Sequence, residues 1–359
     1  MKAIIPTGGR GTRMQPITFS ANKHFIPIAN KPLIFYPIET VADAGIKDIL
    51  ITYNPGMLTM VKNFLGDGSR WGVKFTYVLQ EEPRGLANVF EVCEKALGGD
   101  VFLMHNGDNI FTEGIRETVD YFLKEKPNGL VTMVHHKDNT RLGVPYFDEN
   151  NRLVKYVEKP QNPPHDFAIP GLYFFDQNVF QCFKGDDKIL PSERGELEIS
   201  APYQWLIDHG YRVEVIEYKG KWLDPGKFDD WLEANQYLLD KMADFKMESR
   251  ISADSIAEDR VSLGKNSKIT ASRIKGPVII GDNVEIKNSY IGPYASISSN
   301  CIVEKSHIQN SVIMSGVKIA NVERQIDASI IGPGSELMNG GEPSSSLKLF
   351  IGEKSKIEI

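Results

Sequence analysis

The 359-residue sequence has few cysteines, no basic excess and no long apolar run. Cys93, Cys182 and Cys301 show no metal-ligand or redox spacing, so we expect small buried side chains in a reducing compartment. The formal net charge of −6 argues against a nucleic-acid-binding protein. No segment has the roughly 20 apolar residues that a membrane helix needs, and "MKAIIPTGG" does not resemble a signal peptide. These absences predict a soluble cytoplasmic protein without nucleic-acid or membrane partners.

The first two thirds of the sequence, residues 1–243, alternate β-branched runs with helical patterns. The runs that we expect to form buried strands are "KAIIPT" (2–7), "DILITY" (48–53), "KFTYVL" (74–79), "VFLMH" (101–105) and "GLVTMV" (129–134). Helices are expected over 32–45, 85–99, 197–210 and 227–242. The alternation predicts an α/β domain with a mainly parallel, doubly wound sheet that binds ligands at the carboxyl edge of its strands.

The periodicity changes after a polar segment, 244–250, which we interpret as a linker. Aliphatic residues then recur at steps of five or six: Leu263, Ile269, Ile274, Ile280, Ile286, Ile291, Ile297, Ile302, Ile308, Ile313 and Ile319. This step is typical of hexapeptide repeats, in which stacked coils bury one aliphatic column per face. We therefore expect a parallel β-helix over 251–359 with these side chains inside. We also expect it to support homo-oligomer assembly rather than chemistry.

The glycine-rich segment "PTGGRGTRMQPIT" follows the first expected strand. Gly8, Gly9 and Gly11 have no Cβ, so several backbone N–H groups can approach phosphate oxygens. Arg13 adds a planar guanidinium and Lys23 an ammonium group, both suited to phosphates. The spacing matches neither the P-loop nor the dinucleotide fingerprint. Its donor capacity nevertheless indicates a triphosphate site.

This segment resembles the G-G-x-G-T-R-x-x-P-x-T signature, followed by a lysine, of the sugar-phosphate nucleotidyltransferases. Further blocks of that family occur in order along nearly the whole chain: "GDGSRWG" (66–72), "QEEPRGLA" (80–87), "GDN" (107–109), "VEKP" (157–160), "GLYFFD" (171–176), "RGELEI" (194–199) and "WLDPG" (222–226). The resemblance is strongest to members that make dTDP-glucose. The longer form of these members has a C-terminal left-handed β-helix. The resemblance therefore implies that the expected β-helix of this chain is left-handed.

The resemblance implies attack by a sugar 1-phosphate, expected to be glucose 1-phosphate, on the α-phosphorus of a nucleoside triphosphate, expected to be dTTP. Pyrophosphate is released. The nucleophile is already an anion, so no general base is needed. Lys23 and Arg13 would stabilise the leaving pyrophosphate. Asp108 and Asp224 would jointly hold Mg²⁺, which takes one or two carboxylates together with substrate phosphates.

The remaining site residues implied by the resemblance fall into two groups. The nucleotide-binding group adds Thr12, Gln80 and Gly85 to the three loop glycines. A glutamine can pair with the amide edge of thymine or uracil through one donor and one acceptor. The sugar-phosphate-binding group consists of Asn109, Gly143, Glu158, Lys159, Gly171 and Tyr173.

Three alternatives remain open on the sequence. Pro6 and Thr7 resemble the corresponding residues of uridylyltransferases, so UTP is an alternative to dTTP. His307 lies in the repeat region, where hexapeptide acyltransferases use a histidine base, so a bifunctional nucleotidyl- and acyltransferase is the second. The third is a catalytically silent sugar-nucleotide sensor. The combined presence of Lys23, Asp108, Lys159 and Asp224 argues against that reading.

Overall fold

The structure is a computed structural model that describes residues 1–9, 11–19 and 22–339, and these form two compact units. The first unit comprises Met1–Gly9 and Ile34–Leu223. The second comprises the described parts of Arg10–Leu33 and Asp224–Ile359. The glycine-rich segment therefore contributes to both units, which no local sequence signal indicates.

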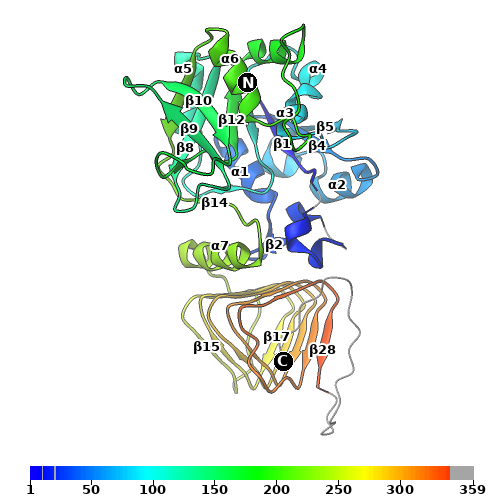
Figure 1. The fold of residues 1–359 in the computed structure, drawn as a ribbon. Coiled ribbons are helices and arrows are strands. Elements are labelled where there is room, and N and C mark those ends of the chain that lie inside the picture. Colours follow the sequence, from blue (N-terminus) through cyan, green and yellow to red (C-terminus); the bar gives the residue numbers. More distant parts are fainter. Residues whose placement is uncertain (10, 20–21, 340–359) are drawn as a thin grey trace. The chain divides into compact units, whose positions relative to one another are not determined.

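An eight-stranded sheet forms the centre of the first unit (Figure 1). Its order is β11 (Phe167–Ala168), β8 (Gly129–His135), β12 (Leu172–Phe175), β6 (Phe102–His105), β1 (Lys2–Pro6), β4 (Asp48–Tyr53) and β5 (Lys74–Leu79), with β13 (Val213–Glu217) also paired to β8. Strands β6, β1, β4 and β5 are mutually parallel, and β12 runs antiparallel between β6 and β8. The mainly parallel α/β sheet that the sequence predicts is confirmed.

The helices of the first unit connect the strands and lie around the sheet (Figure 1). They are α1 (Phe35–Asp43), α2 (Leu58–Leu65), α3 (Leu86–Glu91), α4 (Glu94–Leu97), α5 (Arg116–Glu125), α6 (Ser200–Asp208) and the 3-10 turns η4 (Ser69–Trp71) and η5 (Gln177–Phe183). Two antiparallel pairs lie outside the main sheet: β9 (Gly143–Phe147) with β10 (Leu153–Glu158), and β7 (Ile110–Phe111) with β14 (Trp222–Leu223). The single helix expected over 85–99 is divided into α3 and α4, because the Cys93 amide bonds to the nearer carbonyl of Phe90 (3.0 Å).

A hydrophobic cluster packs β6 and β12 of the main sheet against α3. Phe90 packs against Phe102 and Phe175 at ring-centroid distances of 5.8 and 5.2 Å. The three rings are fully buried, and burial of large apolar side chains is the main favourable contribution to folding. Cys93 and Cys182 lie in the same cluster, and Cys301 lies in the core of the β-helix. Burial raises the pKa of Cys93 to about 12, so its thiol is a packing group.

The second unit begins with the short elements η1 (Thr12–Met14), η2 (Ile17–Phe19), η3 (Lys23–Phe25), β2 (Pro27–Ile28) and β3 (Lys31–Pro32). They pack on α7 (Phe228–Lys241), where the indole of Trp231 donates to the carbonyl of Pro27 (3.0 Å). Asn235, which is fully buried, accepts from the amide of Ala29 (2.9 Å) and the hydroxyl of Ser296 (2.7 Å). One side chain thus joins the N-terminal segment, α7 and the C-terminal repeats.

The C-terminal repeats form a left-handed parallel β-helix with three sheets, as expected (Figure 1). Residues 340–359 of the predicted β-helix lie outside the described residues. The first sheet contains β15 (Ile256–Glu258), β18 (Arg273–Lys275), β21 (Tyr290–Ile291) and β24 (His307–Ile308). The second contains β16 (Val261–Leu263), β19 (Val278–Ile280), β22 (Ala295–Ile297), β25 (Val312–Ile313) and β27 (Ile330–Ile331). The third contains β17 (Lys268–Thr270), β20 (Glu285–Lys287), β23 (Ile302–Glu304), β26 (Lys318–Ala320) and β28 (Glu336–Met338).

Ten of the eleven predicted aliphatic positions are buried inside the β-helix, and Ile302 is the exception. Ile302 is 41% exposed, while the next residue, Val303, is 1% exposed and takes the inward position. The expectation for Ile302 was wrong because successive side chains of a strand point to opposite faces, so a shift of one residue reverses inside and outside. The spacing alone did not distinguish two adjacent aliphatic residues.

A column of buried serines satisfies the backbone at one corner of the coils: Ser255, Ser272, Ser289 and Ser306. The Ser272 hydroxyl donates to the carbonyl of Thr270 (2.7 Å) and accepts from the amide of Ser289 in the next coil (3.0 Å). Ser289 repeats this arrangement with Lys287 and Ser306. Because a buried backbone group without a partner is costly, each serine stabilises two neighbouring coils.

The polar segment before the β-helix already pairs with its first coil. The amide of Glu248 donates to the carbonyl of Leu263 (2.7 Å), and the hydroxyl of Ser249 donates to the carbonyl of Gly264 (2.6 Å). The predicted division at 243, with a linker over 244–250, stays a prediction. The compact units follow another division of the chain.

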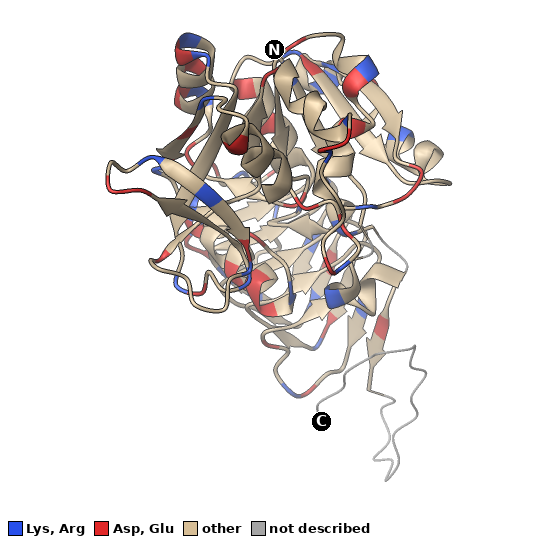
Figure 2. Ribbon diagram, turned by 45° about the horizontal axis from the view of Figure 1, so that its top comes forward, with Lys and Arg blue, Asp and Glu red and all other residues tan. Residues whose placement is uncertain are grey.

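The described residues carry charges of both signs (Figure 2), and none of their helices is suited to a membrane span. Figure 2 shows acidic and basic residues interspersed along the ribbon. None of the helices in the part of the chain that the structure describes combines the length and the apolar character needed to cross a membrane.

We expect Ser272→Ala to lower the free energy of unfolding by about 1–3 kcal/mol, because it leaves the amide of Ser289, a buried residue, without its partner. Thermal and urea unfolding would measure the change. Ser335→Ala is the matched control, since Ser335 is exposed, and it should unfold like the wild type. Equal stability of the two variants would contradict a supporting role for the serine column.

Candidate active site

Three residues that follow parallel strands meet at the carboxyl edge of the sheet. Gly8 follows β1, Asn54 follows β4 and Gln80 follows β5. A Cβ on Gly8 would lie 2.9 Å from Asn54 Oδ1 and 3.4 Å from Gln80 Oε1, so the glycine permits both side chains to approach the backbone. Asn54 Oδ1 is buried and has no hydrogen-bond partner among the described residues. This edge therefore presents amide groups that a ligand can satisfy.

Gly85 is constrained from two sides. Its φ of +110° is a conformation that residues with a side chain rarely adopt, and a Cβ there would overlap the backbone of Leu197. Gly85 immediately precedes α3, and Gln80 lies on the same connection between β5 and α3. Gly9 has a φ of +108°, again in the region that favours glycine. The predicted nucleotide-binding positions 8, 9, 80 and 85 thus lie after β1 and β5.

The loop after β6 carries Asp108 and holds it through Asn109. Asn109 is 3% exposed, and its Nδ2 donates to Asp108 Oδ1 (3.2 Å). Its Oδ1 accepts from the amide of Gly171 (3.2 Å) and from the indole of Trp222 (3.1 Å). A Cβ on Gly171 would overlap the side-chain amides of Asn109 and Asn106, so glycine is required for this packing. The carboxylate of Asp108 is therefore held in place by a buried amide.

His105 ends β6 as a fully buried residue. Its Nδ1 donates to the carbonyl of Asn106 (2.8 Å), and the ring meets Phe111 edge-on at 5.0 Å. Desolvation lowers the pKa of His105 to about 4, partly opposed by the hydrogen bond to Asn106 and by the charge of Asp108. The imidazole is therefore neutral at pH 7, and it supports the loop without adding a charge beside Asp108.

A second polar group surrounds Glu158 at the end of β10. The hydroxyl of Tyr156 donates to Glu158 Oε1 (2.9 Å), and the ring of Tyr156 lies against Gly143, where a Cβ would overlap it. Burial raises the pKa of Glu158, and the negative charge of Glu198 adds to the rise. The hydrogen bond from Tyr156 and the charges of Lys159 and Arg194 oppose it. The structure thus brings Glu158 and Gly143 together.

The other predicted sugar-site residues lie on neighbouring parts of the first unit. Tyr173, on β12, is 4% exposed. Lys159 is exposed and has a φ of +51°, which is uncommon for a residue with a long side chain. Arg194 pairs with Glu198 (2.8 Å), whose charge acts on Glu158. The sequence assigned no role to Arg194, and this pairing connects it to the Glu158 group.

The second unit contains the other predicted residues. A Cβ on Gly11 would lie 3.6 Å from the Cβ of Lys23, which is 9% exposed. The guanidinium of Arg13 lies against Gly226, 3.2 Å from where its Cβ would be, and Gly226 belongs to the turn that begins at Asp224. Thr12, the first residue of η1, is exposed. This unit therefore brings Gly11 close to Lys23, and Arg13 close to the turn of Asp224.

Asp108 and Asp224 remain the residues that could bind a metal. In the described part of the chain, no group of three or more histidine, cysteine, aspartate or glutamate side chains forms a metal site by itself. Mg²⁺ does not require such a group, because it commonly keeps waters and takes substrate phosphate oxygens besides one or two carboxylates. The hard oxygen donor of Asp108, fixed by Asn109, suits this ion.

Sequence reasoning missed three residues of the carboxyl edge: Asn54, Asn88 and Glu91. Asn54 directly follows the predicted strand 48–53, and this position was the available signal. Asn88, which is 1% exposed, accepts from Gln80 Nε2 (3.0 Å) and donates to Glu91 Oε2 (2.8 Å). Asn88 and Glu91 lie on the short helix α3. The amphipathic pattern of this helix gives no sign of a polar contact with Gln80, the residue that follows β5.

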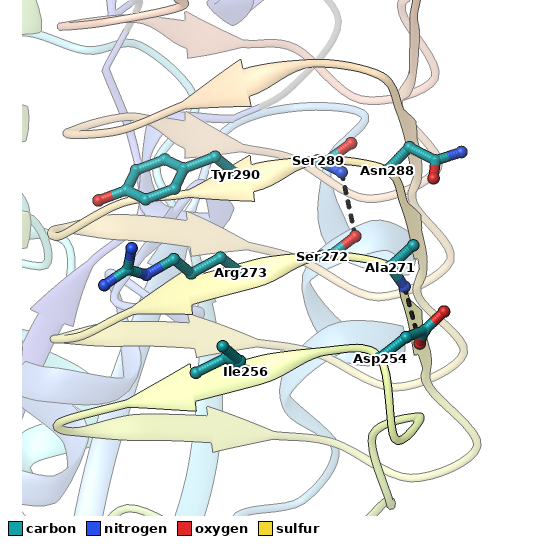
Figure 3. A pocket seen from close by; sticks show the side chains of 8 residues that line it. All are labelled: Asp254, Ile256, Ala271, Ser272, Arg273, Asn288, Ser289 and Tyr290. Carbon is teal, nitrogen blue, oxygen red and sulfur yellow. Dashed lines mark hydrogen bonds between the residues drawn. The ribbon is translucent and has the colours of Figure 1, made fainter.

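The β-helix carries an open groove of about 520 Å³ (Figure 3). Its lining includes Asp254, Ser272 and Arg273, and the serine and the aspartate hold amides of adjacent coils. His307 lies on β24 of the same sheet, where its ring meets Tyr290 edge-on at 4.5 Å. The serine and the aspartate of this groove thus serve the coil backbone.

Comparison with known proteins identifies similar chains over the whole length. The sequence model of a family described as "Nucleotidyl transferase" matches residues 2–241. A protein named glucose-1-phosphate thymidylyltransferase from Streptomyces antibioticus is 35% identical, with 100% of this chain and 99% of the relative covered. The low-salt glycan biosynthesis nucleotidyltransferase Agl11 from Haloferax volcanii is 33% identical, with 100% of both chains covered.

Solved structures resemble the chain over about two thirds of its length. A putative glucose-1-phosphate thymidylyltransferase from Bacillus anthracis, in complex with a sucrose, has a TM-score of 0.62 and 33% identity, and covers 69% of this chain and 98% of its own. A UDP-glucose pyrophosphorylase complexed with UDP-glucose has a TM-score of 0.58 at 22% identity, over 67% of this chain and 99% of its own. The second likeness concerns the fold alone.

We expect Glu158→Gln to raise the free energy of unfolding at pH 8, because it removes a desolvated carboxylate while its oxygen can still accept from Tyr156. The folded-state pKa of Glu158 is raised, so the wild type is penalised only above the pKa of the unfolded chain. The difference in the free energy of unfolding between the wild type and Glu158→Gln should therefore shrink as the pH falls toward 4.

Urea unfolding of both proteins between pH 4 and pH 8 measures this difference, with Glu149→Gln, an exposed loop carboxylate, as the control. A Glu158→Gln protein that is less stable than the wild type at pH 8 would refute the assigned direction of the shift.

Proposed function

Because this chain belongs to the nucleotidyl transferase family, we propose that it joins a sugar 1-phosphate to a nucleoside triphosphate and releases pyrophosphate. The proposed substrates are glucose 1-phosphate and dTTP, which give dTDP-glucose. An oxygen of the sugar phosphate forms a bond to the α-phosphorus. The bond between this phosphorus and the oxygen that bridges it to the β-phosphorus breaks, so pyrophosphate leaves. The full-length relatives named glucose-1-phosphate thymidylyltransferase support this choice.

One observation carries the proposal: the carboxyl edge of the parallel strands holds a buried glutamine amide and a fixed carboxylate. Gln80 lies beside Gly8 after β5 and β1, and Asp108 is held by Asn109 after β6. Since β5, β4, β1 and β6 are consecutive in the sheet, these loops lie at the same edge. A nucleotide needs both kinds of group, one for its base and one for a cation at its phosphates.

The proposed chemistry depends on charge neutralisation and alignment. The attacking phosphate is an anion, so the protein need not remove a proton but must reduce the repulsion between two anions. We assign Lys23 and Arg13 to the triphosphate and to the charge that develops on pyrophosphate. Asp108 and Asp224 are the proposed Mg²⁺ ligands, and bound Mg²⁺ would polarise the phosphoryl oxygens.

The sugar 1-phosphate is assigned to the group around Glu158. A carboxylate that has lost part of its hydration can regain hydrogen bonds from sugar hydroxyls, and the raised pKa of Glu158 reflects this loss. Lys159 is the proposed partner of the sugar's phosphate. Gly143, Gly171 and Tyr173 are the proposed wall of the sugar site, and homo-oligomer assembly through the β-helix stays a prediction.

A matrix of dTTP, UTP, CTP and ATP against several sugar 1-phosphates tests the proposal, with pyrophosphate release as the readout. The highest turnover is expected for dTTP with glucose 1-phosphate, and only in the presence of Mg²⁺. Binding of dTDP-glucose without turnover of any pair would instead identify a silent sensor. Higher turnover with UTP than with dTTP would identify a uridylyltransferase.

We expect Asp108→Asn to reduce kcat about a hundredfold or more while the protein stays folded, because it weakens Mg²⁺ binding. Pyrophosphate release and thermal unfolding are measured together. Asp120→Asn, an exposed aspartate on α5, is the matched control and should keep wild-type activity. Unchanged turnover in Asp108→Asn would remove Asp108 from the metal site.

A further inference from the structure

A chain of polar side chains lies beneath the proposed base-binding residue. Gln80 Nε2 donates to Asn88 Oδ1 (3.0 Å), and Asn88 Nδ2 donates to Glu91 Oε2 (2.8 Å). Gln80 and Asn88 are 3% and 1% exposed, so the bond between them is shielded from water, while the Glu91 side chain is 32% exposed. The guanidinium Nη2 of Arg84 lies 3.8 Å from the same carboxylate oxygen of Glu91. We call Gln80, Asn88 and Glu91 the amide relay.

The carboxylate at the end of the relay determines the orientation of both amides. An ionised carboxylate only accepts hydrogen bonds, so Asn88 must turn its NH₂ group toward Glu91. Its oxygen then faces Gln80, and this oxygen also only accepts. Gln80 must therefore turn its NH₂ group toward Asn88. A rotation of either amide by 180° would bring two acceptors together and leave a buried donor without a partner.

This orientation fixes what Gln80 offers to a ligand. Its Oε1 faces the Gly8 side, 3.4 Å from where a Cβ of that residue would be, and the second N–H of Nε2 is not used by Asn88. Thymine and uracil present an N3–H donor beside the acceptor O4. Cytosine presents the acceptor N3 beside an NH₂ donor. For a base held in one position, cytosine therefore requires the glutamine amide in the reversed orientation.

We propose that Asn88 and Glu91 are positioning residues that make the site select thymine or uracil over cytosine. The inference rests on the proposed function, in which Gln80 pairs with the base. It assigns the choice to the direction of hydrogen bonds in the relay. A site whose buried donors and acceptors are fixed in this way discriminates through groups that the wrong base leaves unpaired.

Glu91→Gln tests the relay, because a terminal amide can donate as well as accept and so permits both inner amides to reverse. We expect the ratio of kcat/KM for dTTP to that for dCTP to fall by about tenfold or more, with part of the change from a gain in dCTP turnover. Glu94→Gln is the matched control: Glu94 pairs with Lys184 (2.6 Å) at the surface and should leave the ratio unchanged.

The double variant Asn88→Asp with Glu91→Gln provides a rescue. The carboxylate introduced at position 88 can only accept, from Gln80 on one side and from the amide introduced at position 91 on the other, so the original direction is restored. We expect the dTTP/dCTP ratio to return toward the wild-type value. A relay that serves only to satisfy buried groups predicts similar losses for both nucleotides and no rescue.

The outcomes separate the inference from the proposed function. A lowered ratio in Glu91→Gln and its recovery in the double variant support the relay. An unchanged ratio in a folded Glu91→Gln protein, or equal loss for dTTP and dCTP, overturns it. If the wild type turns over no sugar 1-phosphate, the proposed function fails. Equilibrium binding of dTTP and dCTP to the same variants then gives the ratio, with the same results expected.

Discussion

The parallel register of four neighbouring strands determines which side chains can reach one ligand. Strand β1 pairs Ala3 with Ile49 of β4 and with Leu103 of β6, so the ends of these strands come at the same level. The residues that follow the strands lie at this edge: the amides of Thr7 and Gln80 still donate to the carbonyls of Thr52 and Tyr53 (3.0 and 2.9 Å). Gly8, Gln80 and Asp108, which are far apart in sequence, can therefore lie at one edge of the sheet. The hydrophobic cluster around Phe90 maintains this level, since it packs β6 and β12 against α3.

Glycine has a different role at each position of this edge. At Gly8 its small size permits the amides of Asn54 and Gln80 to approach the backbone, whereas at Gly85 the left-handed φ is itself required. At Gly171 the space that a Cβ would take is occupied by Asn109, the residue that holds Asp108. A methyl group at these three sites would thus act on different groups: the amides of Asn54 and Gln80, the backbone before α3, and the amide that holds Asp108. The same residue type is required for three separate reasons.

Much of the fold could be predicted because its signals are local. The runs at 48–53 and 74–79 coincide with β4 and β5, and the aliphatic step of five or six residues predicted the β-helix. The choice between Ile302 and Val303 could not be made, because the coil length varies: Ile302 pairs with Lys318, sixteen residues on, while Glu285 pairs with Ile302, seventeen on. The amide relay was also hidden, since nothing in the sequence shows that Asn88 turns toward Gln80 rather than into a core. Long-range contacts, such as those of Asn235 with Ala29 and Ser296, have no local signal at all.

The burial of Glu158 is a cost in folding that the proposed function would use for specificity. Two carboxylates near each other and partly removed from water raise the free energy of the charged form, and one tyrosine hydroxyl offsets only part of that. In the proposed sugar site, a ligand with several hydroxyl groups would supply hydrogen-bond donors to this carboxylate, so binding would recover part of what folding lost. A ligand without them leaves the carboxylate desolvated and unpaired, a much larger penalty than the loss of one exposed hydrogen bond. The amide relay and Glu158 thus act by the same physical means. In both proposals a buried donor or acceptor is fixed by the protein, and a substrate with the complementary group would satisfy it.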